Sequence, residues 1–273
     1  MVAQSLTYSE YSLMHFGLAG WSINRRFRRE DNPLKILDYP RTARDEWGFE
    51  AVELNSPFFA GHDAAYLDEL KRNAEQANVA LWGIAVDGTG NLCAEDDAER
   101  RKNIESCGEW LGTSKHLGLT YARFNTGGNV QPDEAEIERC ADSFRQLAEQ
   151  GAQLGVVVCI ENHGGLSKTP DPIVAVMERV ASPFCRTLPD FGNFAPEIRY
   201  EALEKVVPYA AACHAKFWEF DEHGHDPQMD LGRIKNIFER AAFDGRLAIE
   251  FEGHGDDSDG VRQSLALLRR IFS

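Results

Sequence analysis

Residues 155–165 read GVVVCIENHGG, an apolar and β-branched run that stops at the polar group Glu161-Asn-His163. The run predicts a β-strand and the polar residues predict the turn that follows it. Runs of this kind recur along the chain, each followed by a polar turn and a stretch with helical period. The expected strands are residues 16–21, 51–55, 80–86, 121–125, 155–161, 186–190, 211–216 and 247–252.

About eight strand–helix units in 273 residues predict an α/β protein with the (β/α)8 TIM barrel fold, which typically needs about 250 residues. No linker or change of composition divides the sequence, so we expect a single domain, 1–273. An open doubly wound sheet would need a glycine-rich phosphate loop after its first strand, and residues 17–21 do not supply one.

Two helices can be expected from their start signals. Asp133 follows Pro132 and opens a segment whose apolar residues keep one face, so this helix should bury a stripe against the sheet. Ser258 precedes Val261 and later apolar residues at helical spacing, up to the end of the chain. The last element should therefore be a helix that docks on the barrel.

Composition and charge narrow the classes of partner. A hydrophobic content of 43% suits a globular core, and a formal net charge of −15 disfavours nucleic acid and anionic membrane. The six cysteines form no closely spaced pair, and Met1 to Phe16 lacks the features of a signal peptide. No segment approaches the roughly 20 apolar residues of a membrane span. We therefore expect a cytoplasmic protein with reduced thiols, and a homo-oligomer formed through outer helices remains open.

Four polar residues occupy corresponding places on successive expected strands, at the end of the barrel where active sites form. They are Glu161, Asp190, His214 and Glu250. Three carboxylates and one imidazole are costly to bury together unless a cation balances them. Oxygen ligands with a single nitrogen favour Mn2+, with Mg2+, Co2+ or Zn2+ as alternatives. The competing interpretation is that the glutamates are helix caps or ion-pair partners and that His214 is a core histidine.

A second group of candidates follows from strand alternation, which places side chains two residues apart on one face. This rule adds His163 to Glu161, Lys216 to His214 and Glu252 to Glu250. Asn193 lies in the turn after Asp190 and could also reach inward. His163 and Lys216 would then donate to substrate oxygens. The alternative for Lys216 is that it only balances nearby carboxylates.

The first half of the chain offers weaker candidates. Glu53 and Asn55 end the second expected strand, and Arg123 and Asn125 end the fourth, so polar groups should line the mouth there too. Asn125 is the candidate substrate ligand among them. Four aromatic residues could form apolar walls for a sugar, although core packing is the competing interpretation. These are Trp21, Phe58, Phe59 and Trp218.

The residues at these strand ends carry a family resemblance. The sequence resembles the xylose isomerase-like TIM barrels of the sugar phosphate isomerase/epimerase family, a superfamily that includes ketose 3-epimerases, inosose isomerases and dehydratases, and type IV endonucleases. The resemblance extends through most of the chain in strand order. Its motifs are ENHGG (161–165), PDFGN (189–193), HAK (214–216) and IEFEG (249–253), with weaker support from VEL (52–54).

The resemblance implies that Glu161, Asp190, His214 and Glu250 are metal ligands, and that Glu161 and Glu250 also transfer protons. The expected reaction is then isomerisation or epimerisation of a sugar, inosose or related keto-polyol through a metal-stabilised enediolate. A lyase or dehydratase acting on a 3-keto-glycoside or an inosose is the alternative, because the same intermediate can expel a β-substituent. Two more distant alternatives are a type IV endonuclease-like repair enzyme and a non-catalytic sugar-binding module.

One position departs from the family pattern. Sugar epimerases of this family often carry a histidine three residues after the metal-binding aspartate, and this chain has Asn193. An amide can hydrogen-bond a hydroxyl but cannot carry a proton. The second half of the chain also shows no paired Arg or Lys that would clamp a phosphate, so the family name does not imply a phosphorylated substrate here.

Overall fold

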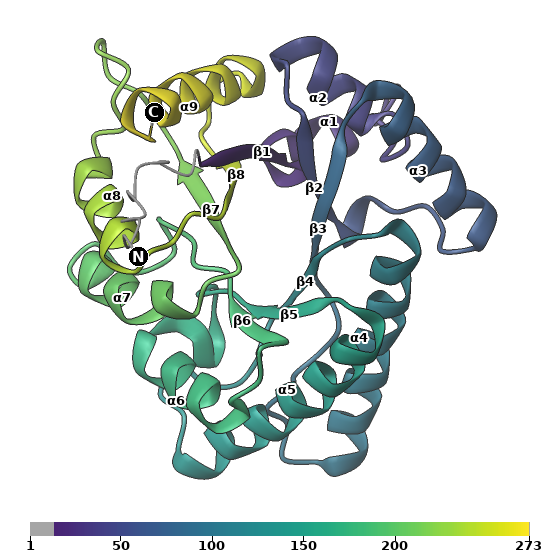
Figure 1. Cartoon of the computed structure of the whole chain (residues 1–273), viewed down its shortest axis with the longest axis vertical. Helices are drawn as coiled ribbons and strands as arrows, with labels where there is room; N and C mark the ends of the chain where they lie inside the picture. The colour runs from purple at the N-terminus through teal and green to yellow at the C-terminus, as the bar shows by residue number, and fades with distance from the viewer. Residues whose placement is uncertain (1–13, 273) are drawn as a thin grey trace, which may run out of the picture.

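The computed structural model describes residues 14–272. Eight parallel strands form one curled sheet, and Figure 1 shows them ringed by the helices. The strands are β1 (His15–Ala19), β2 (Ala51–Asn55), β3 (Ala80–Val86), β4 (Tyr121–Phe124), β5 (Val157–Ile160), β6 (Cys185–Thr187), β7 (Ala212–Phe217) and β8 (Arg246–Phe251). The predicted (β/α)8 barrel is therefore confirmed. Most of the N-terminal stretch that lacks signal-peptide features lies outside the described residues, and the single domain of 1–273 stays a prediction.

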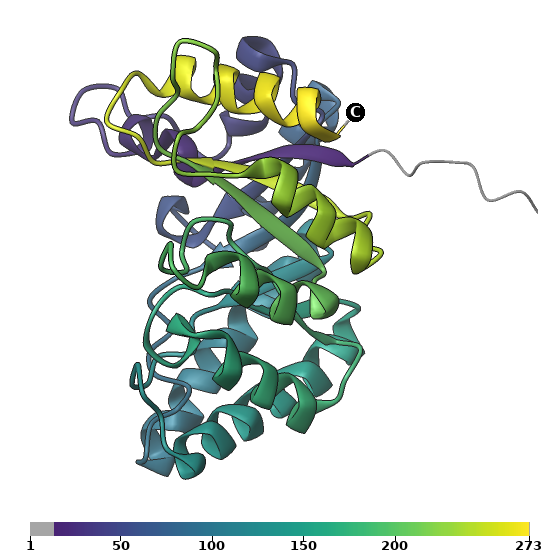
Figure 2. The ribbon, with the colours of Figure 1, turned by 90° about the vertical axis from the view of Figure 1, so that its left-hand side faces the viewer.

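Helices connect the strands and cover the outside of the sheet, as the side view in Figure 2 also shows. The α-helices are α1 (Asn24–Phe27), α2 (Tyr39–Trp47), α3 (Ala64–Ala77), α4 (Asp97–Leu117), α5 (Glu134–Leu154), α6 (Pro170–Val180), α7 (Arg199–Val206), α8 (Leu231–Arg240) and α9 (Asp257–Phe272). Short 3-10 turns are η1 (Gly20–Ile23), η2 (Ser56–Phe58), η3 (Gly165–Lys168) and η4 (Val207–Tyr209).

Local sequence explains where the helices begin and end. Asp133 caps α5 by accepting a hydrogen bond from the backbone N–H of Glu136, as the start signal predicted. The helix ends at Gly155, whose φ of 74° lies in the left-handed region that glycine adopts without strain. Helix α9 buries Val261 and Leu268 against the barrel, so the expected docking helix is also present.

Small residues leave room for two large rings inside the barrel. The ring of Tyr121 in β4 fills the space beside Gly83 in β3, where an added Cβ would come within 2.3 Å of it. The ring of Trp82 fills the corresponding space beside Gly17 in β1. These rings fill the barrel interior below the C-terminal ends of the strands. The polar side chains at the strand ends therefore lie above tightly packed aromatic residues.

The barrel closes between β6 and β7 by isolated bridges. Thr187 pairs with Ala210, and Asp190 pairs with His214. Strand β6 is shorter than the predicted strand of residues 186–190, because Pro189 has no N–H to donate to a neighbouring strand. Its carbonyl still accepts a 2.9 Å hydrogen bond from the N–H of His214. This closure holds Asp190 and His214 side by side at the mouth.

Other predicted strand ends also differ by one or two residues, as β1 and β4 show. Residues 16–21 were expected to be extended, but β1 ends at Ala19 and Trp21 lies in η1. Strand β4 ends at Phe124, so Asn125 is the first residue of the loop. Both shifts leave the polar residues at the C-terminal rim of the sheet.

Candidate metal centre at the mouth of the barrel

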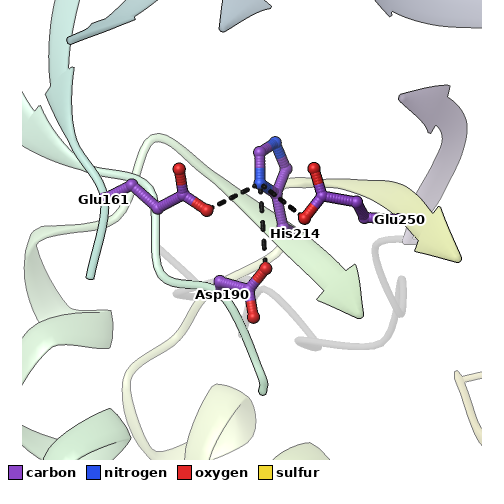
Figure 3. Close-up of side chains that lie close together, drawn as sticks. All are labelled: Glu161, Asp190, His214 and Glu250. Atoms are coloured by element: carbon purple, nitrogen blue, oxygen red, sulfur yellow. Dashed lines mark hydrogen bonds and ion pairs between the residues drawn. The ribbon is translucent and has the colours of Figure 1, made fainter. Parts of the chain in front are cut away.

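The four predicted metal ligands meet at one point of the barrel mouth, shown in Figure 3. Each offers one ligand atom, and these atoms all lie within 4.8 Å of one another. The residues come from four neighbouring positions of the sheet: Glu161 follows β5, Asp190 follows β6, His214 lies in β7 and Glu250 in β8. None is more than 5% exposed. The sequence register therefore predicted which side chains converge.

His214 faces the three carboxylates through one ring nitrogen. Its Nδ1 lies 3.1 Å from Glu161 Oε1, 3.8 Å from Glu250 Oε2 and 3.9 Å from Asp190 Oδ2. Figure 3 shows Glu161 and Glu250 on opposite sides of the imidazole, with Asp190 between them. This geometry leaves one nitrogen and three carboxylate oxygens directed at a common centre.

The charges of the site shift the pKa values of its members in opposite directions. Burial raises the pKa of Asp190 to about 7. The positive charge of Lys216 acts to lower this pKa, and the negative charges of Glu250 and Glu161 act to raise it. Burial also acts to raise the pKa of Glu161, but the charges of Arg123 and His214 outweigh it and lower this pKa strongly. For His214, burial acts to lower the pKa, and the carboxylates around the ring raise it well above its usual value.

The donor set fits a divalent cation. Asp190 Oδ2 is buried and has no hydrogen-bond partner among the described residues, so it has an unused lone pair at the centre of the cluster. Carboxylate oxygens with a single imidazole are ligands that Mn2+, Mg2+ and Co2+ accept in proteins. Glu161, Asp190, His214 and Glu250 are the residues that would hold such an ion.

Glu53 has a larger role in the site than the sequence analysis gave it. It is fully buried in β2, and its Oε1 lies 2.7 Å from His214 Nε2. The hydroxyl of Tyr121 donates to its other oxygen at 2.5 Å. A carboxylate at Nε2 keeps the proton on that nitrogen and leaves the lone pair of Nδ1 for the cluster. The signal in the sequence was present, since Glu53 ends the second apolar run.

Arg123 and Asn162 hold two of the carboxylates in place. Arg123 is 4% exposed, and its Nε lies 2.9 Å from Glu161 Oε2. The side chain of Asn162 binds the backbone of Asp190 twice, accepting from its N–H at 2.7 Å and donating to its carbonyl at 3.0 Å. Asn162 was missed because it neighbours Glu161 in sequence and strand alternation directs it away from the barrel interior.

Lys216 and Asn193 lie beside the cluster, and their role as substrate ligands stays a prediction. The ammonium group of Lys216 lies 3.0 Å from Glu250 Oε2 and 3.4 Å from Asp190 Oδ2, and donates to Asn193 Oδ1 at 2.9 Å. Asn193 Nδ2 in turn donates to Glu161 Oε1 at 3.2 Å. Asn193 therefore connects a carboxylate on one side of the site with a cation on the other.

The remaining candidates lie at the edge of the site. Glu252 is exposed and reaches within 3.4 Å of Lys216 Nζ. Asn125 is half-buried and donates to Asp87 Oδ1 at 2.9 Å. His163 is exposed, because β5 ends at Ile160 and strand alternation no longer applies three residues later. Substrate contacts by these residues stay predictions.

The four aromatic candidates separate into different contacts. Trp21 stacks on Phe58 with ring centroids 5.9 Å apart, and both are half-buried in turns that follow β1 and β2. Phe59 instead packs edge-on against Trp110 of α4. The ring of Trp218 lies against Gly192 in the loop that carries Asp190 and Asn193. Phe59 therefore holds a loop against a helix, which agrees with the competing interpretation that this residue serves packing.

A family model described as xylose isomerase-like TIM barrel matches residues 42–271, which include every member of the metal cluster. The chain belongs to this family. The resemblance inferred from the strand-end motifs is thereby confirmed, and the barrel architecture agrees with it.

The sequence matches a deglycosidase subunit, and the fold matches two sugar epimerases. The chain is 36% identical over 74 residues to a C-glycoside deglycosidase alpha subunit of Arthrobacter globiformis, a match covering 24% of this chain and 21% of that subunit. It is structurally similar to a 3-keto-D-glucoside 4-epimerase from E. coli, with a TM-score of 0.72 and 16% identity over 94% of this chain and 99% of that one.

A D-psicose 3-epimerase from Clostridium cellulolyticum H10 gives a TM-score of 0.75 at 15% identity, over 95% of this chain and 100% of that one. At these identities the structural matches demonstrate a shared fold. The curated relative is matched over only about a fifth of its length. Within the described residues, no helix is both long and apolar enough to cross a membrane.

Proposed function

We propose that this protein is a divalent-metal-dependent isomerase or epimerase of a sugar, inosose or related keto-polyol. The observation that carries the proposal is the convergence of His214 Nδ1 with three buried carboxylates at the barrel mouth. The proposed ligands are Glu161, Asp190, His214 and Glu250, with Mn2+ as the first choice of metal. Structural likeness to sugar epimerases supports the substrate class.

When bound, the cation would acidify a C–H next to a carbonyl and hydroxyl chelated at the centre. The protein's own residues then move the proton. Glu161 and Glu250 flank the imidazole on opposite sides, so one carboxylate can remove a proton from a sugar carbon and either can return one. Arg123 and Asn193 hold Glu161 ionised and oriented, as a general base requires.

Residues next to the cluster are proposed to bind the substrate. Lys216 and Asn193 present an ammonium and an amide group where a substrate oxygen would develop negative charge. His163, Glu252 and Asn125 are proposed to contact hydroxyls at the rim. Because Asn193 cannot carry a proton, proton transfer in this protein rests on the two glutamates.

A lyase reaction on a 3-keto-glycoside or an inosose is the second candidate. The similarity to a C-glycoside deglycosidase subunit favours it. Both reactions begin by removing a proton beside a carbonyl, and they differ in whether a proton returns or a β-substituent leaves. The cluster contains a single histidine and the chain has a net charge of −15, so neither supports the endonuclease alternative.

Proton transfer can be tested without knowing the natural substrate. The metal-free protein is titrated with Mn2+, and the loaded form is incubated in D2O with ketoses, inososes and 3-keto-glycosides and followed by NMR. We expect deuterium beside the carbonyl of at least one compound, and release of the substituent if the reaction is a lyase. Glu161→Gln, which removes the proposed general base, should abolish exchange, while Glu204→Gln on the outer helix α7 should not. Absence of both metal binding and exchange would overturn the proposal.

A further inference from the structure

Asp87 is a carboxylate at the mouth that the proposed metal chemistry does not use. It directly follows β3, and its backbone N–H donates to Ser56 Oγ at 2.9 Å. Its Oδ1 accepts two hydrogen bonds, one from Arg123 Nη1 at 2.8 Å and one from Asn125 Nδ2 at 2.9 Å. The position of this oxygen is therefore fixed by groups from the neighbouring strand end.

The second carboxylate oxygen of Asp87, Oδ2, is free to accept a hydrogen bond from a ligand. Oδ2 has no hydrogen-bond partner among the residues that the structure describes, and the side chain is 30% exposed, so this oxygen is not sealed inside the barrel. A carboxylate with one oxygen fixed and the other open presents a preoriented acceptor for O–H groups. Holding the side chain in advance lowers the entropy cost of binding such a group.

Arg123 places this open oxygen close to the candidate metal centre. The same guanidinium group contacts Asp87 Oδ1 through Nη1 and Glu161 Oε2 through Nε, at 2.8 Å and 2.9 Å. Asp87 therefore lies one guanidinium group away from a proposed metal ligand, on the β3 and β4 side of the mouth. A sugar whose carbonyl end is at the cluster would reach Asp87 with its other end if it extended over this side.

We propose that Asp87 Oδ2 binds hydroxyl groups at the end of the substrate remote from the reacting carbonyl, and that this end is uncharged and not phosphorylated. The inference rests on the proposed function and specifies its substrate class. A phosphate dianion at this place would face the carboxylate, while Arg123 is already engaged by Asp87 and Glu161. A free hydroxyl can donate to the carboxylate and bind favourably.

The substitution Asp87→Asn removes the proposed acceptor for substrate hydroxyls but keeps the contact with Arg123. The amide oxygen of the variant can still accept from Arg123 and Asn125, while the open carboxylate oxygen becomes an NH2 group. The probes are D-fructose, methyl 3-keto-β-glucoside and the 6-phosphate ester of each. Affinity is measured by calorimetry with the metal-loaded wild-type protein, and KM and kcat by deuterium exchange. Asp68→Asn, in a pair with His116 on the outer helices, is the matched control.

For the wild type we expect the neutral form of at least one probe to bind at least 100-fold more tightly than its phosphate ester. Asp87→Asn should raise KM for that neutral probe about 10- to 100-fold with kcat within twofold, and narrow the preference over the ester. Equal binding of the two forms, or an unchanged KM in the variant, would overturn the role of Asp87. Failure of every probe together with absence of metal binding would instead overturn the proposed function on which this inference rests.

Discussion

Glu53→Gln is the change that best tests how the barrel prepares His214 for a metal. The substitution keeps the shape of the side chain but removes the charge that lies 2.7 Å from His214 Nε2. A glutamine can also donate to Nε2, which would move the ring proton to Nδ1, the nitrogen that faces the cluster. We therefore expect the variant to bind divalent metal more weakly than the wild type while folding normally.

The size of the effect follows from the two hydrogen bonds that Glu53 accepts, from His214 and from Tyr121 at 2.5 Å. A hydrogen bond to a charged group contributes about 1.5–3 kcal/mol. Each 1.4 kcal/mol corresponds to about tenfold in Kd, so metal affinity should fall roughly 10- to 100-fold. Tyr121→Phe leaves the bond between Glu53 and His214 in place, and its effect should be smaller.

The assay is a titration of metal-free wild type, Glu53→Gln and Tyr121→Phe with Mn2+ or Co2+ in competition with a chelator. Circular dichroism checks that each variant is folded. Histidine nitrogen NMR of the Zn2+-loaded wild type should show a proton on Nε2 of one residue, assigned by its loss in His214→Asn. The reasoning is refuted if Glu53→Gln binds metal as tightly as the wild type while His214→Asn does not bind it, or if the loaded wild type carries the proton on Nδ1.

Three further changes probe the charge and packing of the site. Metal binding displaces a proton from Asp190, whose pKa burial raises to about 7, and one from His214, whose pKa the carboxylates raise well above its usual value. Metal affinity should therefore fall as the pH is lowered, by up to about a hundredfold per pH unit below pH 7 where both protons must leave, and a Kd that is flat between pH 6 and pH 8 would contradict this. Lys216→Met removes a cation 3.4 Å from Asp190, so it should tighten metal binding about tenfold or more; weaker binding would argue against the charge-balancing role. Gly83→Ala places a Cβ 2.3 Å from the ring of Tyr121 and should lower the free energy of unfolding by about 1–3 kcal/mol in denaturant titrations, whereas Gly112→Ala, with open space around it, should not.

The barrel could be predicted from sequence because its signal is repetitive. Each apolar run ends at a polar residue, and the ends of parallel strands meet at one rim, so the register of Glu161, Asp190, His214 and Glu250 was enough to expect their meeting. The short strand β6 was harder to predict. Pro189 interrupts its pairing, and only the fold shows that the chain beyond it is bridged to His214.

The supporting residues could not be ranked from sequence, because their roles depend on contacts between distant strands. Glu53 and Tyr121 are separated by many residues, and their 2.5 Å hydrogen bond requires Gly83 to make room for the tyrosine ring. Asp87 follows an apolar run as the metal ligands do, but its link to Glu161 passes through Arg123, which sequence spacing does not reveal. His163 shows the limit of strand alternation, because the strand ends before the rule can place it.

Charge balance explains why the metal-free protein can keep so many carboxylates in its interior. Two buried cations, Arg123 and Lys216, face four buried carboxylates, which leaves an excess of two negative charges; these carboxylates are Glu53, Glu161, Asp190 and Glu250. In the absence of metal, protons can supply the difference, because the carboxylates raise the pKa of His214 against the effect of burial, and burial raises that of Asp190 to about 7. A divalent cation supplies the same two charges at the same place. Metal binding should therefore exchange with protons at His214 and Asp190, and leave Arg123 and Lys216 to hold the glutamates that are proposed to move the substrate's proton.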